Sequence, residues 1–271
     1  MTQLDAAALR QSLSAAADLE HLEVFARIDS TNTYLKDQPP PTPGRFRVAI
    51  ADHQTAGRGR RDRSWISEPG KSLCLSMSYQ FVETPADLSA LTLALGVGVA
   101  ACLEQFGVAD IRLKWPNDLL VGRDKLGGIL TESRLRGGDT TNVIIGLGLN
   151  LALPDAVATE LSSGWTDTAT GLESVLATPP ARDELSGKII DALFSSCRQY
   201  EAGGFAGFAA EFERFDALRN LEVTVDAADG EVSGVARGVD DDGALLVETA
   251  AGTRRVITGS VTHMGGAAGN E

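Results

Sequence analysis

Four arginines lie within the seven residues from 57 to 63, in the segment GRGRRDR. A guanidinium group is planar, permanently charged and able to bind a carboxylate or a phosphate through two parallel hydrogen bonds. The neighbouring glycines, Gly57 and Gly59, allow the backbone to approach a ligand closely. The segment therefore predicts binding of an anionic small molecule, such as a carboxylate together with a nucleotide phosphate. A solvated basic loop without a ligand is the alternative that composition alone leaves open.

A second group of polar residues follows a predicted strand, in the segment Lys114-Trp115-Pro116-Asn117-Asp118. Pro116 favours an extended backbone at Trp115, so Lys114 and Trp115 project to opposite sides at the strand end. A lysine fixed at a strand end acts as a point cation for a carboxylate or phosphate oxygen. Asn117 and Asp118 are also good turn formers, and shaping the turn is the alternative role for both.

Two further segments carry glycines inside predicted strands, namely KLGGILTE from Lys125 and GLGLN from Gly146. A glycine in a strand often marks the close approach of a ligand or of another backbone. Asn150, at the end of the second segment, offers an amide that can hydrogen-bond a sugar or a base. Taken alone, each segment is a weak signal of a binding site.

The overall composition excludes several other classes of function. The 271 residues carry 24 Lys and Arg against 37 Asp and Glu, a net charge of −13. This balance argues against a nucleic-acid partner and against an anionic membrane surface. Neither a GxxxxGK[ST] loop nor a complete GxGxxG fingerprint is present. The three cysteines and three histidines are scattered, so no metal site can be assigned, and the lack of a disulfide framework and of a secretory signal predicts a cytoplasmic protein.

A sheet must bring these segments together, and the hydrophobic pattern predicts one. Strands are expected at residues 22–28, 47–54, 72–81, 111–116, 118–133 (as a hairpin) and 141–153, with helices at 4–18, 88–106, 181–203 and 205–215. A further helix should begin at Ser30-Thr31-Asn32, which are residues of the N-cap type. After about Leu218, short strands between Asp-Gly and Ala-Gly turns predict a small β-barrel. We therefore expect an α+β domain over residues 1–216, a β-barrel over 217–265 and a disordered tail over 266–271.

Together and in this order, the segments resemble those of the biotin protein ligases (biotin–[acetyl-CoA-carboxylase] ligases). The resemblance is carried by Ser30-Thr31-Asn32, by QTAGRGRRDRSW from Gln54 to Trp65, and by KWPND, KLGGILTE and GLGLN. It covers residues 20–150 closely and the C-terminal barrel loosely. It implies a mixed β-sheet with flanking helices, of the class II aminoacyl-tRNA synthetase-like, biotin/lipoyl ligase type, followed by an SH3-like barrel. One departure is Asp62, where the family usually has glycine; its carboxylate is expected to pair with Arg61 or Arg63.

The resemblance implies a two-step, AMP-forming reaction. The biotin carboxylate attacks the α-phosphate of MgATP, which gives biotinyl-5′-AMP and pyrophosphate. A lysine of a biotin carboxyl carrier domain, from acetyl-CoA carboxylase or a related acyl-CoA carboxylase, then attacks the acyl-adenylate. Fixed cations must offset the repulsion between carboxylate and polyphosphate. By the same resemblance Lys114 and Arg60 are the catalytic residues, and the arginine loop closes over the ligands to exclude water.

The resemblance also assigns binding roles to individual residues. Biotin is expected to contact Ser30, Thr31, Asn32, Gln54, Gly57, Arg58, Gly59, Arg60, Lys114, Gly127 and Gly128. ATP and the adenylate are expected to contact Arg58, Arg60, Arg63, Trp65, Lys114, Asn117, Lys125 and Asn150. The neutral side chains of the first group suit the ureido head of biotin, which is a neutral donor and acceptor. Trp65 has an anchoring role in the core as its alternative.

Three alternatives to this interpretation remain. A lipoate-type acyl-adenylate ligase has a similar fold, but KWPND together with GRGRR favours biotin. A ligase that is also a transcriptional repressor carries an N-terminal helix-turn-helix domain, for which a first predicted strand at residue 22 leaves no room. A pure binding module is disfavoured by Lys114. The apolar stretch at residues 88–103 is too short and too interrupted to span a bilayer, and we expect a monomer or a weak dimer.

Overall fold

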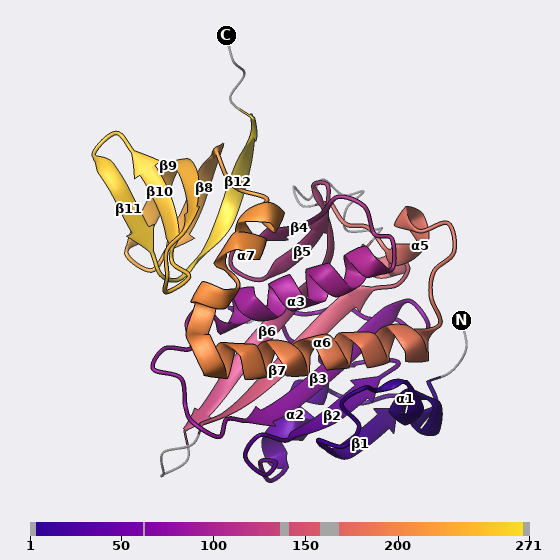
Figure 1. Cartoon of the computed structure of the whole chain (residues 1–271). Helices are drawn as coiled ribbons and strands as arrows, with labels where there is room; N and C mark the ends of the chain where they lie inside the picture. Colours follow the sequence, from indigo (N-terminus) through magenta and orange to yellow (C-terminus); the bar gives the residue numbers. More distant parts are fainter. Residues whose placement is uncertain (1–3, 62, 136–140, 158–167, 268–271) are drawn as a thin grey trace.

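A mixed seven-stranded sheet forms the centre of the molecule (Figure 1). The computed structural model describes residues 4–61, 63–135, 141–157 and 168–267. In spatial order the strands are β1 Leu19–Phe25, β2 Phe46–Ala51, β3 Ser72–Gln80, β7 Thr141–Asn150, β6 Asp124–Leu135, β5 Asp118–Val121 and β4 Ile111–Lys114. Strands β1 and β2 are parallel, and the other neighbouring pairs are antiparallel. The mixed sheet and its helices confirm the predicted α+β class.

The central strand β3 shows how the two faces of the sheet differ. Leu73, Leu75, Met77 and Tyr79 belong to the large apolar core. Because side chains alternate along a strand, Ser76 lies on the opposite face. All of β3 is buried, so both faces of the sheet are covered at this strand. The apolar face builds the core, and the opposite face is available to polar residues.

Helices α3 Leu91–Gln105 and α6 Arg182–Gly203 lie side by side across the apolar face of the sheet (Figure 1). The short helix α1 Ala6–Ser12 packs against α6. After α6, the 3-10 turn η1 Gly204–Gly207 and helix α7 Ala209–Phe215 return over α3. Helix α3 is apolar around most of its circumference because it is enclosed by the sheet, α6 and α7.

Helix α2 Thr31–Asp37 lies on the other face of the sheet, against β2, β3 and β7. Ser30 caps it, since the Ser30 side chain accepts a hydrogen bond from Thr33 N. A second, small apolar cluster of Leu35, Ala49 and Ile144 fixes the helix to the sheet. The helix predicted to begin at the Ser30-Thr31-Asn32 segment is confirmed.

A separate five-stranded antiparallel sheet follows near the C-terminus, which confirms the predicted small β-domain (Figure 1). In spatial order its strands are β11 Gly252–Val256, β10 Leu245–Thr249, β9 Gly230–Val239, β8 Leu221–Ala227 and β12 Gly259–Ala267. Hydrogen bonds from Ser89, Arg60, Arg61, Trp115 and Arg123 connect it to the larger domain. Trp115 Nε1 donates to the carbonyl oxygen of Gly243 over 3.0 Å, and Ser89 Oγ donates to that of Asp242 over 2.6 Å.

Several predicted boundaries were wrong. The helix predicted over residues 4–18 ends at Ser12, because the backbone N–H groups of Ser14 and Ala15 donate to the Asp191 carboxylate of α6 instead. The strand predicted over 22–28 is β1, which spans 19–25 because it pairs with β2 from Leu19 onward. A short helix, α5 Leu172–Val175, lies in a segment for which no helix or strand was predicted. Strand β12 includes residues 266 and 267 of the predicted tail, and residues 268–271 lie outside the described part.

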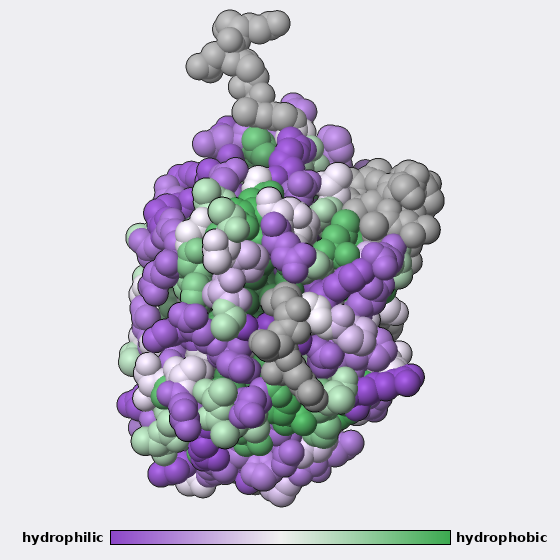
Figure 2. All heavy atoms as spheres, turned by 90° about the vertical axis from the view of Figure 1, so that its right-hand side faces the viewer, coloured by the Kyte–Doolittle hydropathy of each residue, from purple (hydrophilic) through white to green (hydrophobic). Residues whose placement is uncertain are grey.

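The molecular face in Figure 2 carries mostly hydrophilic residues, with smaller apolar patches between them. Among the described helices, none is both long enough and apolar enough to cross a membrane. The apolar stretch at residues 88–103 falls largely on α3, where its side chains contribute to the core.

Candidate active site

A cavity of about 580 Å³ lies on the sheet face that carries α2. It brings together motifs that are distant in the sequence. The predicted site residues that line it are Ser30, Thr31, Asn32, Gln54, Arg58, Gly59, Arg60, Arg63, Trp65, Lys114, Asn117, Lys125, Gly128 and Asn150. Gly57 and Gly127 are the predicted residues outside this lining.

Packing of the backbone explains these two glycines. A Cβ atom at Gly127 would lie 2.5 Å from the carbonyl oxygen of Gly148 on the neighbouring strand. A Cβ atom at Gly57 would collide with the carbonyl oxygen of Trp65. Both positions therefore require glycine for the close approach of two backbone segments, and their expected contact with biotin stays a prediction.

Neutral side chains form a hydrogen-bonded network at one end of the cavity. Gln54 Oε1 accepts from Thr31 N at 2.8 Å and from Thr31 Oγ1 at 3.0 Å. Asn32 Oδ1 accepts from Ser76 Oγ at 2.6 Å, and a Cβ atom at Gly146 would collide with the Asn32 amide. Ser76 also lies 2.6 Å from Thr31 Oγ1. Ser76 was not predicted from the sequence, although the alternation of β3 was a signal for it.

Glu132 on β6 connects this neutral network to the arginine loop. Its carboxylate accepts from Asn32 Nδ2 at 3.0 Å and from Lys36 Nζ at 2.5 Å, and it lies 3.2 Å from Arg58 Nη2. Burial raises the pKa of Glu132, but the hydrogen bonds from Lys36 and Asn32 and the charges of Lys36 and Arg58 outweigh burial and hold the pKa below its usual value. The ionised carboxylate therefore orients Asn32 and holds Arg58. No role for Glu132 was predicted from the sequence.

The arginine loop is a short hairpin. Arg58 and Ser64 form an antiparallel bridge. Gly59 N donates to the carbonyl oxygen of Arg63 over 2.7 Å, and Arg63 N donates to that of Arg60 over 3.1 Å. These backbone bonds define the positions from which the arginine side chains leave the loop.

The side chains at the tip of this hairpin have different partners. Arg60 lines the cavity and its Nη1 donates to the carbonyl oxygen of Gly259 over 3.4 Å. Burial lowers the pKa of Arg60, and the neighbouring charge of Arg61 lowers it further. Arg61 lies outside the cavity lining and pairs with Asp226 of β8 at 2.6 Å. Asp62, predicted to pair with a neighbouring arginine, lies outside the described residues.

Trp65 follows the hairpin and lines the cavity. A Cβ atom at Gly148 would collide with the Trp65 ring, so this glycine makes room for the indole. Trp65 is half-buried, and its Nε1 is enclosed with no hydrogen-bond partner among the described residues. Its ring is thus part of the cavity wall.

Cations line the part of the cavity formed by the ends of β4, β5 and β6. Lys114 is the last residue of β4, and no hydrogen-bond or ion-pair partner of its ammonium group occurs in the described part of the chain. Lys125 Nζ instead lies 2.7 Å from Asp118 Oδ1. Lys114 is therefore available to a ligand, whereas Lys125 is held by a carboxylate.

Two predicted amides use their nitrogen atoms within the protein. Asn117 Nδ2 donates to the carbonyl oxygen of Ile129 over 3.0 Å, which supports its role in shaping the turn. Asn150 Nδ2 donates to that of Thr170 over 3.1 Å. These internal hydrogen bonds fix the orientation of both amides before a ligand arrives, and both residues line the cavity.

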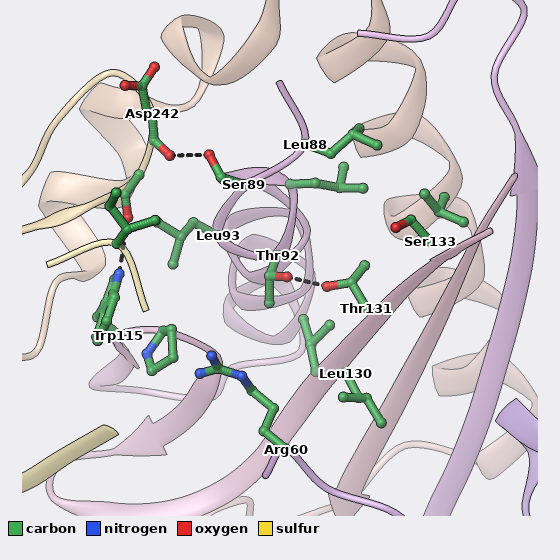
Figure 3. Close-up of a pocket in the computed structure, with 16 residues that line it drawn as sticks. Arg60, Leu88, Ser89, Thr92, Leu93, Trp115, Leu130, Thr131, Ser133 and Asp242 are labelled. Carbon is green, nitrogen blue, oxygen red and sulfur yellow. Dashed lines mark hydrogen bonds between the residues drawn. The ribbon is translucent and has the colours of Figure 1, made fainter. Parts of the chain in front are cut away.

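A second pocket, of about 250 Å³, adjoins the cavity and shares five lining residues with it, namely Arg60, Trp115, Pro116, Ile129 and Leu130 (Figure 3). It lies between the start of α3, strand β6 and the C-terminal sheet. Figure 3 shows Thr92 and Thr131 hydrogen-bonded to each other, with the side chain of Arg60 below this pair in the view. Arg60 therefore forms part of the wall of both spaces.

The C-terminal sheet contributes to the main cavity through strand β12. Ser260, Val261 and Thr262 line it. No site residue was predicted in this sheet, because the segment carries no motif and its proximity to the cavity arises only from tertiary packing.

Comparison with known proteins identifies the family. Residues 24–150 match the Biotin/lipoate A/B protein ligase family, and residues 220–264 match the Biotin protein ligase C terminal domain. The biotin--[acetyl-CoA-carboxylase] ligase of Mycobacterium tuberculosis is 31% identical over 268 residues, which cover 96% of each chain. The chain belongs to the biotin protein ligase family. The present chain is also similar to the bifunctional ligase/repressor BirA of Escherichia coli. The identity is 36%, over 83% of the present chain and 68% of BirA.

Solved structures of ligases confirm the fold. The Aquifex aeolicus biotin protein ligase in complex with biotin and ATP has a TM-score of 0.72 and 26% identity, with 90% of this chain and 97% of that chain covered. A mutant of the same Aquifex aeolicus ligase in complex with biotin has a TM-score of 0.74 and 26% identity, with 89% and 98% covered. The ligase fold thus extends over both sheets of the present chain.

The described residues of this ligase contain no group of three or more His, Cys, Asp and Glu side chains that could hold a metal ion. Asp118 is the one carboxylate among the described residues lining the cavity, and it is paired with Lys125. The described lining is therefore mainly cationic, with neutral polar groups at one end and one carboxylate.

Proposed function

We propose that this ligase activates biotin with MgATP to biotinyl-5′-AMP and then transfers the biotinyl group to a lysine of a biotin carboxyl carrier domain. The observation that carries the proposal is a single cavity in which neutral hydrogen-bonding groups lie at one end and cations lie at the other. One of these cations, Lys114, has no hydrogen-bond or ion-pair partner among the described residues. Such a cavity suits a ligand with a neutral polar head and a carboxylate that must meet a polyphosphate.

The neutral end is proposed to hold the ureido head of biotin. Asn32, Thr31, Ser30 and Gln54 provide amide and hydroxyl groups whose orientations are set by internal hydrogen bonds. A ureido group offers two N–H donors and one carbonyl acceptor, so uncharged partners match it without leaving a buried charge. Ser76, which also lines the cavity, and Glu132 hold Asn32 through hydrogen bonds.

The cationic end is proposed to join the two reactants. A biotin carboxylate oxygen attacks the α-phosphorus of ATP, the bond from that phosphorus to the bridging oxygen breaks, and pyrophosphate leaves. Lys114 and Arg60 stabilise the charge that develops on the phosphoryl and carboxylate oxygens, while Arg58 and Arg63 offset the charge of the reactants. A desolvated guanidinium such as Arg60 interacts more strongly with an anion than an exposed one does.

The second step is proposed to use the same cations. The carrier lysine amine attacks the acyl carbon of biotinyl-5′-AMP, the bond to the phosphate oxygen breaks, and AMP leaves with its charge stabilised by Lys114. Trp65, Asn117, Lys125 and Asn150 are proposed to contact the adenylate. Water must be excluded because an acyl-adenylate hydrolyses readily.

Magnesium is proposed to enter as MgATP. The ion offsets phosphate charge when it is bound, and a divalent cation of this kind commonly takes one or two carboxylates together with substrate phosphates. Asp118, with the neighbouring Asn117, is the group in the described lining that fits this role. The chain itself contributes the positioning of the phosphates through Lys114 and the arginine loop.

The acceptor is proposed to be the carrier domain of acetyl-CoA carboxylase or a related acyl-CoA carboxylase. We also propose a cytoplasmic enzyme that acts as a monomer or a weak dimer. The three cysteines, Cys74, Cys102 and Cys197, are free and buried, which fits a reducing compartment.

Mass spectrometry of the acceptor tests the proposed function. The ligase is incubated with biotin, ATP, magnesium and an apo carrier domain, and the carrier is digested and sequenced. One biotinyl group on one lysine is expected. A parallel reaction with lipoate in place of biotin serves as the control. Modification by lipoate but not by biotin would establish the lipoate-type activity instead.

A further inference from the structure

We propose that Arg61 and Asp226 form a latch that holds the arginine loop closed against the C-terminal sheet and thereby retains biotinyl-5′-AMP between the two steps. This inference rests on the proposed function and gives a role to Arg61, the arginine of the loop that lies outside the cavity lining. Arg61 is a positioning residue in this account, because it acts through the loop and its neighbour Arg60.

The contact between Arg61 and Asp226 has two points. Arg61 Nη1 lies 2.6 Å from Asp226 Oδ2, and Arg61 Nη2 donates to the Asp226 carbonyl oxygen over 3.0 Å. A guanidinium held at two points has a defined orientation as well as a favourable charge interaction. The two side chains are 36% and 61% exposed, so water competes for both partners. The contact is thus specific in geometry and weak enough to open during turnover.

The backbone at Arg61 supports a specialised role. Its φ of 52° lies in the left-handed region, which costs energy for a residue with a side chain. The hydrogen bond from Arg63 N to the Arg60 carbonyl oxygen closes the turn around this position. The fold maintains an unfavourable conformation at the residue that contacts the other domain.

The latch lies beside the wall that the C-terminal sheet contributes to the cavity. Asp226 on β8 pairs in register with Ser260 on β12, and Ser260 lines the cavity. The next residue of the loop toward the cavity, Arg60, donates to the Gly259 carbonyl oxygen on the same strand. Arg61 therefore fixes the loop at the point where Arg60 and β12 meet. Opening the latch would let Arg60 move away from β12.

Loss of the latch is expected to affect the release of biotinyl-5′-AMP more than its formation. With the latch closed, the loop and β12 together cover the cationic end, where the adenylate phosphate is proposed to lie. Loss of the latch should let biotinyl-5′-AMP leave faster, by about five- to tenfold for a partly exposed ion pair with a charged hydrogen bond. Formation of the adenylate should change less, because Lys114, Arg58 and Arg60 remain present.

A charge-swap experiment tests the latch. The full chain is loaded with labelled biotin and MgATP without a carrier domain, unlabelled biotin is added in excess, and the loss of labelled biotinyl-5′-AMP from the protein is followed. Arg61→Asp and Asp226→Arg should each accelerate this loss about five- to tenfold. The double variant Arg61→Asp/Asp226→Arg should recover most of the retention, because it restores the ion pair in reversed orientation.

Asp229→Arg is the matched control, since it breaks the exposed pair of Asp229 with Arg254 in the same sheet at 2.7 Å. It should retain the adenylate as the wild type does. Melting temperatures of all variants identify any that unfold. Loss rates of both single variants equal to that of the wild type would overturn the latch, as would a double variant no better than the singles. A wild-type chain that forms no biotinyl-5′-AMP would refute the proposed function instead.

Discussion

Arg58 Nη2 lies 3.2 Å from Glu132 Oε1, so the first arginine of the loop is held by a carboxylate on the central sheet. The same carboxylate accepts a hydrogen bond from Asn32 Nδ2. One half-buried acid therefore links the neutral end of the cavity to its cationic end. The link makes the two halves of the proposed site interdependent.

Glu132→Gln should raise the KM for biotin about ten- to one-hundredfold, since hydrogen bonds with a charged partner contribute ~1.5–3 kcal/mol. The amide has no charge to hold Arg58 and no longer orients Asn32 uniquely. The kcat should change much less, because Lys114 is untouched. Steady-state kinetics at varied biotin concentration measure both. Glu248→Gln, which alters an exposed pair with Arg237, is the control. Equal KM values for both variants would contradict the positioning role of Glu132.

Gly148→Ala should destabilise the protein by ~1–3 kcal/mol and weaken substrate binding, because the added methyl group displaces the Trp65 ring. Urea unfolding and the KM values for both substrates measure the two effects. Gly203→Ala is the matched control, since no atom lies within 4 Å of its Cβ position. A Gly148→Ala protein with wild-type stability and KM values would show that Trp65 has no defined place in the site.

Burial raises the pKa of the Asp216 carboxyl to about 6, while a hydrogen bond from Leu218 N opposes the shift. Because the folded-state pKa is above the unfolded value, the folded protein binds more protons between about pH 4 and pH 6. Asp216 therefore contributes most favourably to the free energy of unfolding at low pH, and this contribution is lost as the pH rises from about 4 to about 6. Two pKa units correspond to roughly 2–3 kcal/mol.

Asp216→Asn should accordingly gain stability relative to the wild type as the pH rises from 4.5 to 8, by about 2 kcal/mol. Chemical denaturation at the two pH values measures the change, and other titrating groups cancel in the comparison. The Asn side chain keeps an acceptor for Leu218 N. A stability difference independent of pH would show that Asp216 does not titrate in this range.

Biotin with ATP should protect the arginine loop from trypsin, which cleaves after Arg60, Arg61 and Arg63. Bound carboxylate and phosphate groups neutralise the arginines and order the loop, so cleavage should slow several-fold. Timed digestion followed by mass spectrometry locates the sites. Cleavage in the exposed strand β11, at Arg254, is the internal control. If all sites were cut equally fast with and without ligands, the proposed closure of the loop would be wrong.

The sequence predicted the parts of the site that consist of contiguous and unusual residue types. GRGRR predicted an anion site through its closely spaced guanidinium groups, and KWPND through a lysine fixed at a strand end. Ser76, Glu132 and Ser260 were missed because each is a single ordinary residue. Pairing of distant strands brings Ser76 to the cavity and Glu132 beside Asn32 and Arg58, whereas packing of the C-terminal sheet brings Ser260 there. At Gly57 and Gly127 a sequence alone does not reveal the close backbone contacts with Trp65 and Gly148 that the structure shows.

Secondary structure was also predicted well where the signal is local and less well where it depends on distant residues. Helix α3 and strand β3 were predicted well because their apolar patterns are long and regular. The end of α1 was misplaced because the carboxylate that stops it, Asp191, lies on α6, which is far along the chain. Boundaries set by such distant partners leave no local trace in the sequence.

Formation of biotinyl-5′-AMP by the wild type and by Lys114→Ala tests the central claim most directly. Purified protein is mixed with biotin and MgATP without acceptor, and the adenylate is quantified by mass spectrometry in single-turnover time courses. The wild type should form one equivalent. Lys114→Ala should form it about 100- to 1000-fold more slowly, as expected for loss of a group that stabilises developing charge, with little change in melting temperature, because its ammonium has no partner in the described structure. Failure of the wild type to form any adenylate, or an equal rate in the variant, would contradict the proposed mechanism.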